Sequence, residues 1–355
     1  MKKNTVALYD PYLDVLGGGE KHILSIMKVL ADEGYDATIF WNKDLSEEIK
    51  SHLNISFPKL TFQKNIFLDT SESVFSRLDK LKQYDTLLYV TDGSYFFSTA
   101  KKTVIFCMVP QRSLYNMTAL NKLKTVNSTF ISNSIYTQQL LSSWHVKSKV
   151  VYPFISEEFF QNYSEKKQKK ILVVGRFFTQ LHAKRQDLAI EWFIELQKKN
   201  LFTDYKLQLV GNIKNEDNRY YEKLQKLAKG NKNIEFYPNV SFKELLQLYK
   251  HAEIYWHMTG IGINEQKNPE KVEHLGITPL EAMASGCVVF AYNAGGLKEL
   301  IIDGKNGYLF SNQEDLFTKM QHLSHTNVIQ KNAYNFVEHK FDYAVFAKRV
   351  KEILL

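Results

Sequence analysis

Two acidic residues in the second half of the chain lie in a pattern that suits sugar-phosphate chemistry. Glu273 and Glu281 are separated by seven residues. Thr278 and Pro279 predict the N-cap and the first residue of a helix, which puts Glu273 in the preceding loop and Glu281 on the first turn. A loop acid in this position can reach a sugar. Surface capping and charge are the alternative explanation for two such acids considered alone.

The backbone at the start of this helix suits a phosphate group. The N–H groups of Gly276, Ile277 and Thr278 would converge at the positive end of the helix dipole, where a diphosphate is stabilised. Cleavage of a sugar–phosphate bond builds negative charge on the departing diphosphate, so cations must be fixed nearby. Arg176 and Lys184, which follow the apolar run 171–174, are candidates for these cations. A pair of surface cations beside a strand end is the alternative.

The sequence contains no obvious metal site. Asp-x-Asp is absent, and the ten histidines show no close pairing with acids at metal-ligand spacing. We therefore expect no metal and no cofactor.

A glycine-rich loop, Gly17-Gly18-Gly19-Glu20, precedes the first predicted helix. Its backbone could face a phosphate, and a plain turn without a ligand is the alternative. The dinucleotide fingerprint G-x-G-x-x-G fails because its sixth position is His22, and the second strand ends in Trp41-Asn42-Lys43 without a ribose-binding acid. The loop therefore does not indicate an NAD enzyme.

Apolar runs alternate with segments of helical period along the whole chain, which predicts parallel sheets covered by helices. In the first half the predicted strands are 6–9, 37–41, 86–90, 103–109, 129–132 and 149–152, and the helices are 20–31, 114–125 and 135–144. In the second half the strands are 171–175, 206–210, 234–237, 253–257 and 288–292, and the helices are 217–229, 241–250, 278–285, 343–354 and one that carries Leu188 to Leu196.

The alternation of strands and helices is interrupted once, after the first half of the chain, and then begins again. This predicts two doubly wound domains of α/β class that face each other across a cleft. We expect an N-terminal Rossmann-like domain over 1–155, a polar linker over 156–170, a C-terminal Rossmann-like domain over 171–340, and a last helix over 341–355.

The block around Glu273 resembles the retaining GT-B glycosyltransferases of family 4, the "group 1" glycosyltransferases. The resemblance rests on the Glu273–Glu281 pair, on Asn293-x-Gly295-Gly296, and on Val174-Gly175-Arg176 with Lys184, which is aligned through the following residues 185–190. It covers about residues 5 to 355 and is strong in the second domain only.

The resemblance implies a GT-B fold in which the second domain binds the donor, the first binds the acceptor, and the last helix crosses back to the first domain. It implies that Glu273 contacts the transferred sugar and that Glu281 binds the nucleotide ribose. It implies further that Arg176 and Lys184 neutralise the departing diphosphate. It places Gly18 and Gly19 near the diphosphate and the base near Asn239 and Val240. His257 could line the donor pocket or be structural, and the first domain has Met108-Val109-Pro110 where this family often has His-x-Pro.

The expected reaction is therefore transfer of a hexose from a UDP- or GDP-sugar to a hydroxyl of a glycan or glycolipid, with retention of the anomeric configuration. The leaving phosphate would accept the proton. The donor base, the sugar, the acceptor and the role of the polar loop 259–272, a lid or a specificity element, are left open by the sequence. The alternatives are a noncatalytic or nucleic-acid-binding protein, and an epimerase or phosphorylase of the same fold; a phosphorylase would need a pyridoxal phosphate lysine, which nothing marks.

Composition limits the setting of this chemistry. The 355 residues carry a net charge of +8, divided equally about residue 155, which favours anionic partners such as nucleotide phosphates or acidic lipids and shows no nucleic-acid motif. Cys107 and Cys287 are too few for a disulfide scaffold. Apolar stretches are too short to span a membrane, so we expect a cytoplasmic protein. Residues 111–124 mix cations with apolar side chains and either rest on an acidic membrane or cover their own sheet.

Overall fold

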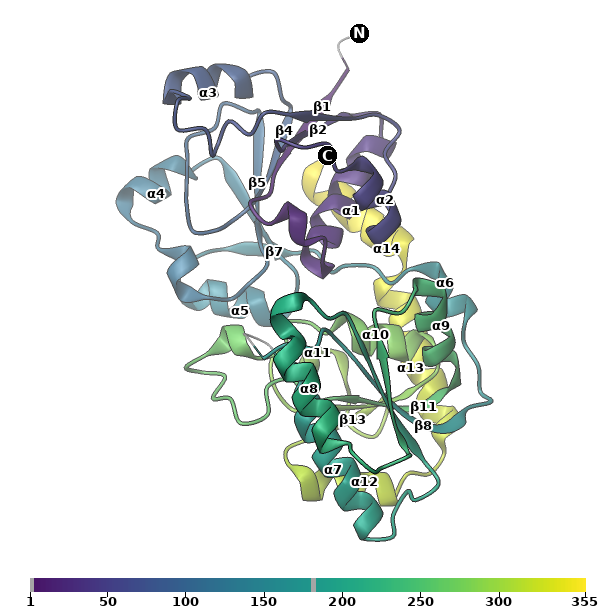
Figure 1. Ribbon diagram of the computed structural model, residues 1–355. Helices are drawn as coiled ribbons and strands as arrows, with labels where there is room; N and C mark the ends of the chain where they lie inside the picture. The colour runs from purple at the N-terminus through teal and green to yellow at the C-terminus, as the bar shows by residue number, and fades with distance from the viewer. Residues whose placement is uncertain (1–2, 180–182) are drawn as a thin grey trace. The chain divides into compact units, whose positions relative to one another are not determined.

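The computed structural model describes residues 3–179 and 183–355. The chain divides into two compact units, one of Met1–Pro153 with Ala344–Leu355 and one of Phe154–Tyr343 (Figure 1). Each unit is a parallel sheet with helices on both faces, so the expected α/β class with two Rossmann-like domains is confirmed.

The sheet of unit 1 has seven strands within the described residues, in the order β3-β2-β1-β4-β5-β6-β7. Its central strands are buried apolar runs, as a parallel sheet covered on both faces requires. The strands are β1 (Thr5–Tyr9), β2 (Asp36–Phe40), β3 (Leu60–Gln63), β4 (Thr86–Val90), β5 (Lys102–Cys107), β6 (Ser128–Ser132) and β7 (Ser148–Val150).

The helices of unit 1 separate into two layers. Helices α1 (Gly18–Asp32), α2 (Ser46–Leu53) and α14 (Tyr343–Leu354) lie on one side of the sheet (Figure 1). The other side carries α3 (Val74–Leu81), α4 (Ala119–Lys124) and α5 (Ile135–Ser143). Two 3-10 helices, η1 (Leu13–Val15) and η2 (Arg112–Tyr115), complete the unit.

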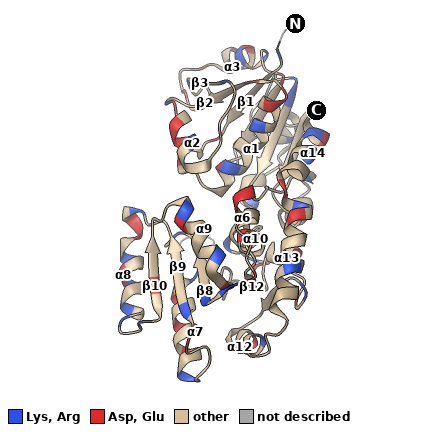
Figure 2. Ribbon diagram, turned by 90° about the vertical axis from the view of Figure 1, so that its right-hand side faces the viewer, with Lys and Arg blue, Asp and Glu red and all other residues tan. Residues whose placement is uncertain are grey.

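The last helix belongs to unit 1 through its apolar face and its charges. In α14, Phe346, Val350, Ile353 and Leu354 are buried at the core spacing expected from the sequence. The ring of Phe346 lies 6.0 Å from that of His22 in α1, and Lys351 pairs with Glu33. Figure 2 shows α14 beside α1, with residues of both charge signs on its outer side.

The sheet of unit 2 has six strands within the described residues, in the order β10-β9-β8-β11-β12-β13. Its core contains large buried side chains such as Trp256, Phe290 and Phe193. The strands are β8 (Gln168–Val174), β9 (Lys206–Gly211), β10 (Ile234–Pro238), β11 (Ala252–His257), β12 (Val288–Tyr292) and β13 (Tyr308–Phe310). The helices are α6 (Glu157–Gln161), α7 (Gln186–Lys198), η3 (Asn215–Asp217), α8 (Asn218–Leu227), α9 (Phe242–His251), η4 (Pro269–Lys271), α10 (Ile277–Ala284), α11 (Leu297–Leu300), α12 (Gln313–Gln321) and α13 (Thr326–Phe341).

Segment 156–170, which we expected to be a linker, holds α6 and the start of β8. Phe159 in α6 is buried and its ring lies 5.5 Å from that of Tyr249, so one apolar anchor fixes a segment whose composition is otherwise polar. The single helix expected over 114–125 is two short helices, η2 and α4. Thr118 separates them because its hydroxyl accepts a hydrogen bond from the Asn121 N–H and caps α4.

Several further elements were not predicted: α2, β3, α3, β13, α11, α12, α13 and the 3-10 helices η1 (Leu13–Val15) and η4 (Pro269–Lys271). The first three have eight residues or fewer and are partly exposed, so each offers few positions in which an apolar period can be recognised. Among the described residues no helix is both long and apolar enough to cross a membrane.

Candidate active site

The centre of the candidate site is Glu273, which lies in the loop between β11 and α10. Its Oε2 atom is 2.6 Å from the Nζ atom of Lys184 and 2.8 Å from the Nε2 atom of His257. The three side chains are 13%, 14% and 1% exposed, respectively. A carboxylate that is mostly withdrawn from water is thus held by one cation and one imidazole.

His257 reaches this position because it is the last residue of β11, which pairs with β8. Burial lowers the pKa of His257, and the Lys184 charge acts in the same direction, against the contact with Glu273. The ring is therefore neutral at pH 7 and donates its Nε2–H to the carboxylate. Of the two interpretations that the sequence left open for His257, this contact places it in the candidate site.

Lys184 is positioned by the residues that follow it at the start of α7. Arg185 has a positive φ of 50°, and its guanidinium bonds to Asp187 and to the backbone carbonyl of Ile261. The buried side chain of Gln186 donates to the carbonyl groups of Gly175 and Arg176, which fixes α7 against the end of β8. Residues 180–182, within the segment that joins Arg176 to Lys184, lie outside the described residues.

The loop that carries Glu273 is supported by a second loop, which contains Gly295 and Gly296. The Gly296 N–H donates to the carbonyl oxygen of Glu273 over 2.8 Å. A Cβ atom at Gly295 would lie 2.1 Å from that same oxygen, so only glycine permits this approach. The Gly295 N–H in turn donates to Glu265, whose carboxylate also pairs with Lys298. Loop 259–272 is therefore tied to the residues that support Glu273.

Helix α10 begins two residues earlier than we expected. Its first residue is Ile277, and Gly276 is the N-cap, with a φ of 108° that favours glycine. The prediction that Thr278 caps the helix is wrong, because its hydroxyl instead accepts a hydrogen bond of 2.8 Å from buried Tyr255. The N–H groups of Ile277 and Thr278 still belong to the first turn, whose amides lack intrahelical partners.

Glu281 lies beyond the first turn and is held by a buried tyrosine. The Tyr249 hydroxyl donates to Oε2 of Glu281 over 2.9 Å and lies 3.4 Å from the carbonyl oxygen of Thr278. Burial raises the pKa of Tyr249 well above its usual range, and the Glu281 charge adds to that effect. The hydroxyl therefore stays protonated and orients the carboxylate.

Arg176 makes its own ion pairs rather than a contact with Glu273. Its guanidinium lies 2.8 Å from Glu216 and 3.0 Å from Asp217, and 5.1 Å from the centre of the Phe178 ring. Asp217 is buried and Glu216 is mostly exposed. The structure thus brings Lys184 to Glu273 and holds Arg176 on η3, a few residues beyond the end of β9.

Val240 lines a hollow whose lining does not include Glu273. This hollow has a volume of about 310 Å³ and its lining includes Gln208, Tyr237 and residues of α9. Asn239, with a φ of 52°, uses its side-chain oxygen to accept a hydrogen bond from the Ile213 N–H. The loop after β10 is thereby fastened to the loop after β9.

Gly18 and Gly19 begin α1 in unit 1. Gly17 is the N-cap, and its N–H donates a hydrogen bond of 2.7 Å to Oε2 of Glu20. The side chain of Met108 covers Gly19, because a Cβ atom there would lie 1.7 Å from its sulfur. Gly18 is exposed. Of these two glycines, Gly18 has the more open backbone toward solvent.

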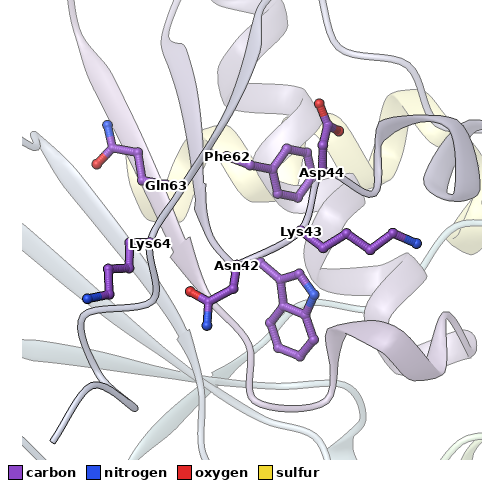
Figure 3. A pocket seen from close by; sticks show the side chains of 7 residues that line it. Asn42, Lys43, Asp44, Phe62, Gln63 and Lys64 are labelled. Atoms are coloured by element: carbon purple, nitrogen blue, oxygen red, sulfur yellow. The ribbon is translucent and has the colours of Figure 1, made fainter.

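A hollow of about 480 Å³ lies at the carboxyl ends of β2 and β3 in the same unit. Figure 3 shows Lys43 and Lys64 pointing in opposite directions, with Asn42 between them and Gln63 next to Lys64. Lys43 pairs with Glu48 and Lys64 with Asp69, so their charges are neutralised away from one another.

The arrangement in unit 2 can bind a ligand that has hydroxyl groups at one end and negative charge at the other. Glu273 and His257 offer hydrogen bonds to hydroxyl groups, and Lys184 with the start of α10 offers positive charge. No three or more His, Cys, Asp or Glu side chains within 3–179 and 183–355 are grouped to hold a metal. Sequence reasoning missed the supporting residues Tyr249, Tyr255, Asp217 and Glu265, for which local sequence carries no signal.

Comparisons with known proteins identify the family of the chain. Residues 154–339 match the model of a family described as Glycosyl transferases group 1, which is more than half of the chain. A mouse protein named GDP-Man:Man(3)GlcNAc(2)-PP-Dol alpha-1,2-mannosyltransferase is 27% identical over 250 residues, which cover 64% of this chain and 48% of that protein. A Xenopus tropicalis protein of the same name is 25% identical over 407 aligned residues, which cover 91% and 80%. The chain thus spans about half the length of the mouse relative and most of the frog one.

Solved structures match along the whole chain. A glycosyltransferase from Rickettsia africae superposes with a TM-score of 0.75 at 17% identity, covering 100% of this chain and 98% of that one. HepE from Anabaena in complex with UDP and glucose superposes with a TM-score of 0.68 at 17% identity, covering 99% of both chains. At this identity the likeness is one of fold.

Proposed function

The chain belongs to the group 1 glycosyl transferases and has the GT-B fold, and on this basis we propose that it is a retaining hexosyltransferase of family 4. It would move a hexose from a UDP- or GDP-sugar to a hydroxyl group of a glycan or lipid-linked acceptor. The observation that carries this proposal is the contact of Glu273 with both Lys184 and His257. Unit 2 would bind the donor and unit 1 the acceptor.

The donor sugar lies across the Glu273 cluster in this proposal. Glu273 and His257 bind sugar hydroxyls, Lys184 and the first-turn amides of α10 bind the diphosphate, and Arg176 adds charge near it. Gly276, Ile277 and Thr278 line the phosphate, Glu281 binds the ribose, and Val240 lies near the base.

The reaction needs no metal in this scheme. The acceptor oxygen bonds to the anomeric carbon on the face that the leaving group departs from, while the bond from that carbon to the phosphate oxygen breaks. The acceptor proton passes to the departing phosphate. Lys184 stabilises the charge that develops on the diphosphate, at the point where a fixed cation lowers the barrier most.

Two families of donor have support from the related proteins. The names of the mouse and frog relatives specify GDP-mannose, and the HepE complex contains UDP and glucose. We therefore propose GDP-mannose and UDP-glucose as the first donors to test. The same mannosyltransferase names specify an acceptor on PP-Dol, which supports a lipid-linked acceptor. We propose on this basis that the protein acts at a membrane.

The donor class can be tested by thermal stabilisation with UDP, GDP, ADP and their sugars. A ligand at 100 times its Kd adds about 2.7 kcal/mol to the free energy of unfolding. One base should stabilise the protein, and Glu281→Ala should weaken that shift. Folded protein that no nucleotide stabilises would contradict the donor assignment.

The stereochemistry requires a separate measurement. With the donor identified, NMR of the product formed on a simple acceptor should show the same anomeric configuration as the donor sugar. A product of the opposite configuration would refute the retaining mechanism and leave the glycosyltransferase assignment intact.

A further inference from the structure

Residues 111–124 divide between the two interpretations given above. Tyr115 is buried in the core of unit 1, with Leu114 and Met117 packed against the same cluster, whereas helix α4 does not cover the sheet. None of its six residues is buried. Leu120 and Leu123 are 54% and 59% exposed, and Val126 just after the helix is 73% exposed. Three large apolar side chains within seven positions therefore face away from the core.

The charge of this region has one sign only. Between Asp92 and Glu157 the sequence contains no acidic residue, while it contains seven basic ones. Lys101 pairs with Asp85 and Lys102 bonds to a backbone carbonyl near the C-terminus. Within the part of the chain that the structure describes, the other five form no ion pair: Arg112, Lys122, Lys124, Lys147 and Lys149.

A hollow of about 470 Å³ lies beside α4. Its lining includes Arg112, Lys122, Asn116, Trp144 and His145, and it contains no acidic side chain. The Trp144 ring stacks on buried Tyr115, with centroids 5.8 Å apart, so the floor of the hollow is rigid. Two cations and an amide around one hollow suit a phosphate group.

We propose that the α4 face, defined by Arg112, Leu120, Lys122, Leu123, Lys124 and Val126, docks on a bilayer that contains anionic phospholipid, with one lipid phosphate in the hollow between Arg112 and Lys122. The apolar side chains enter the interface between headgroups and acyl chains, and the unpaired cations bind the headgroups. Charge complementarity selects this occupant, because an acid-free surface attracts a negatively charged membrane and an interface with a typical protein would need matching acids.

This inference deepens the proposed function, since a docked unit 1 would meet a lipid-linked acceptor at the membrane. Its test needs neither donor nor turnover, so its failure is distinguishable from failure of the proposed function. The full-length protein is sedimented with vesicles of phosphatidylcholine alone and with vesicles that also contain phosphatidylglycerol. We expect binding to the anionic vesicles, weakened by added salt, and much weaker binding to the neutral ones.

Two pairs of substitutions separate charge from apolar insertion. Lys122→Gln with Lys124→Gln should lower the partition coefficient roughly 25-fold, about fivefold for each cation removed. Leu120→Ser with Leu123→Ser should lower it about tenfold or more. None of these side chains is buried, so the thermal unfolding temperature should be unchanged.

Matched controls come from exposed residues of unit 2. Lys226→Gln with Lys229→Gln removes equal charge, and Ile302→Ser with Val328→Ser removes side chains that are 53% and 58% exposed. Both controls should bind vesicles like the unmodified protein. The proposal is overturned by equal binding to both vesicle types, by controls that weaken binding as much, or by no vesicle binding together with salt-sensitive binding of a random oligonucleotide.

Discussion

The carboxyl edges of the two sheets both contain buried acidic side chains, in opposite electrostatic surroundings. In unit 2, Glu273 pairs with Lys184, and buried Asp217 pairs with Arg176. In unit 1, Asp10 at the end of β1 and Glu20 in α1 are 1% and 3% exposed, and in the described structure neither forms an ion pair. On the α4 face of unit 1, conversely, the cations Arg112, Lys122 and Lys124 form no ion pair in the described structure.

This difference distinguishes the two units: the acids of unit 2 are arranged to bind a ligand, and those of unit 1 are not. A buried carboxylate held by a cation remains charged more readily than a buried carboxylate without a partner, so it can bind a ligand as an anion. Asp10 faces Glu20 and Asp14 and has one carboxyl oxygen without a hydrogen-bond partner. Burial, with repulsion from Glu20, raises its pKa to about 7. We infer that unit 2 does the chemistry and that unit 1 binds through its surface.

The largest effect should come from breaking the cluster in unit 2. Glu273→Gln and Lys184→Met are each expected to lower kcat/KM about 100-fold or more, because each removes a charge placed at the reacting bond. Steady-state kinetics with the donor identified by stabilisation provides the measurement. Lys319→Met removes a comparable ion pair, with Asp303 at 2.9 Å, and should leave the rate unchanged. Equal rates in all four proteins would remove the chemical distinction between the units.

Asp10 provides the converse test in unit 1. Its pKa is raised from 3.8 to about 7 in the folded protein, so the folded state binds more protons than the unfolded state between these values. The free energy of unfolding therefore falls as pH rises from about 4 to about 7. Asp10→Asn has no such proton to lose, and should be more stable than the unmodified protein at pH 8 by about 1 to 3 kcal/mol.

Urea unfolding at pH 5 and pH 8 measures this effect. The gain from Asp10→Asn should shrink markedly at pH 5, where Asp10 is mostly protonated. Asp14→Asn, on an exposed neighbour, is the control and should change stability little at either pH. A variant that is less stable at pH 8 would mean that the Asp10 charge is stabilised by a partner, as in unit 2.

A smaller effect should come from the support of Glu281. Tyr249→Phe removes the 2.9 Å hydrogen bond to its carboxylate and should raise the Kd for the nucleotide about fivefold, the worth of one such bond. Calorimetric titration with the nucleotide measures it. Tyr205→Phe removes an equivalent bond of 2.6 Å to Glu253 and is the matched control. If both variants bind alike, the proposed ribose contact is unsupported.

The sequence predicts the order of strands and helices and the residue types in the site better than it predicts which side chains contact one another. Apolar runs locate most strands of both sheets, because a parallel strand buried on both faces needs such a run. Glu273 and Lys184 were chosen for their chemistry and for a family resemblance, and the structure puts them 2.6 Å apart. The bond of Tyr249 to Glu281 joins residues 32 positions apart and depends on how α9 packs, which periodicity does not contain.

Two errors show where local patterns fail. Thr278 has the residue type of an N-cap, but the positive φ of Gly276 starts α10 earlier and the Thr278 hydroxyl serves Tyr255. Residues 119–124 have the apolar spacing of a helix that covers a sheet, but none of them is buried. The same amphipathic pattern fits a protein core or an external interface, and only the tertiary structure distinguishes the two.

The smallest effect should come from the loop that supports Glu273 from outside. Lys298→Ala removes the ion pair of 2.5 Å with Glu265, while Glu265 keeps its hydrogen bond to the Gly295 N–H. Because Lys298 is 41% exposed, its charge is largely screened by water, and we expect kcat/KM to fall about twofold. Glu265→Gln weakens the ion pair and the bond to Gly295 together and should cost more. Steady-state kinetics of both variants, with Lys319→Met as the shared control, measures how far the order in unit 2 extends from its charged centre. A loss in Lys298→Ala as large as that in Lys184→Met would mean that the catalytic charge is distributed over the loop rather than concentrated at Glu273.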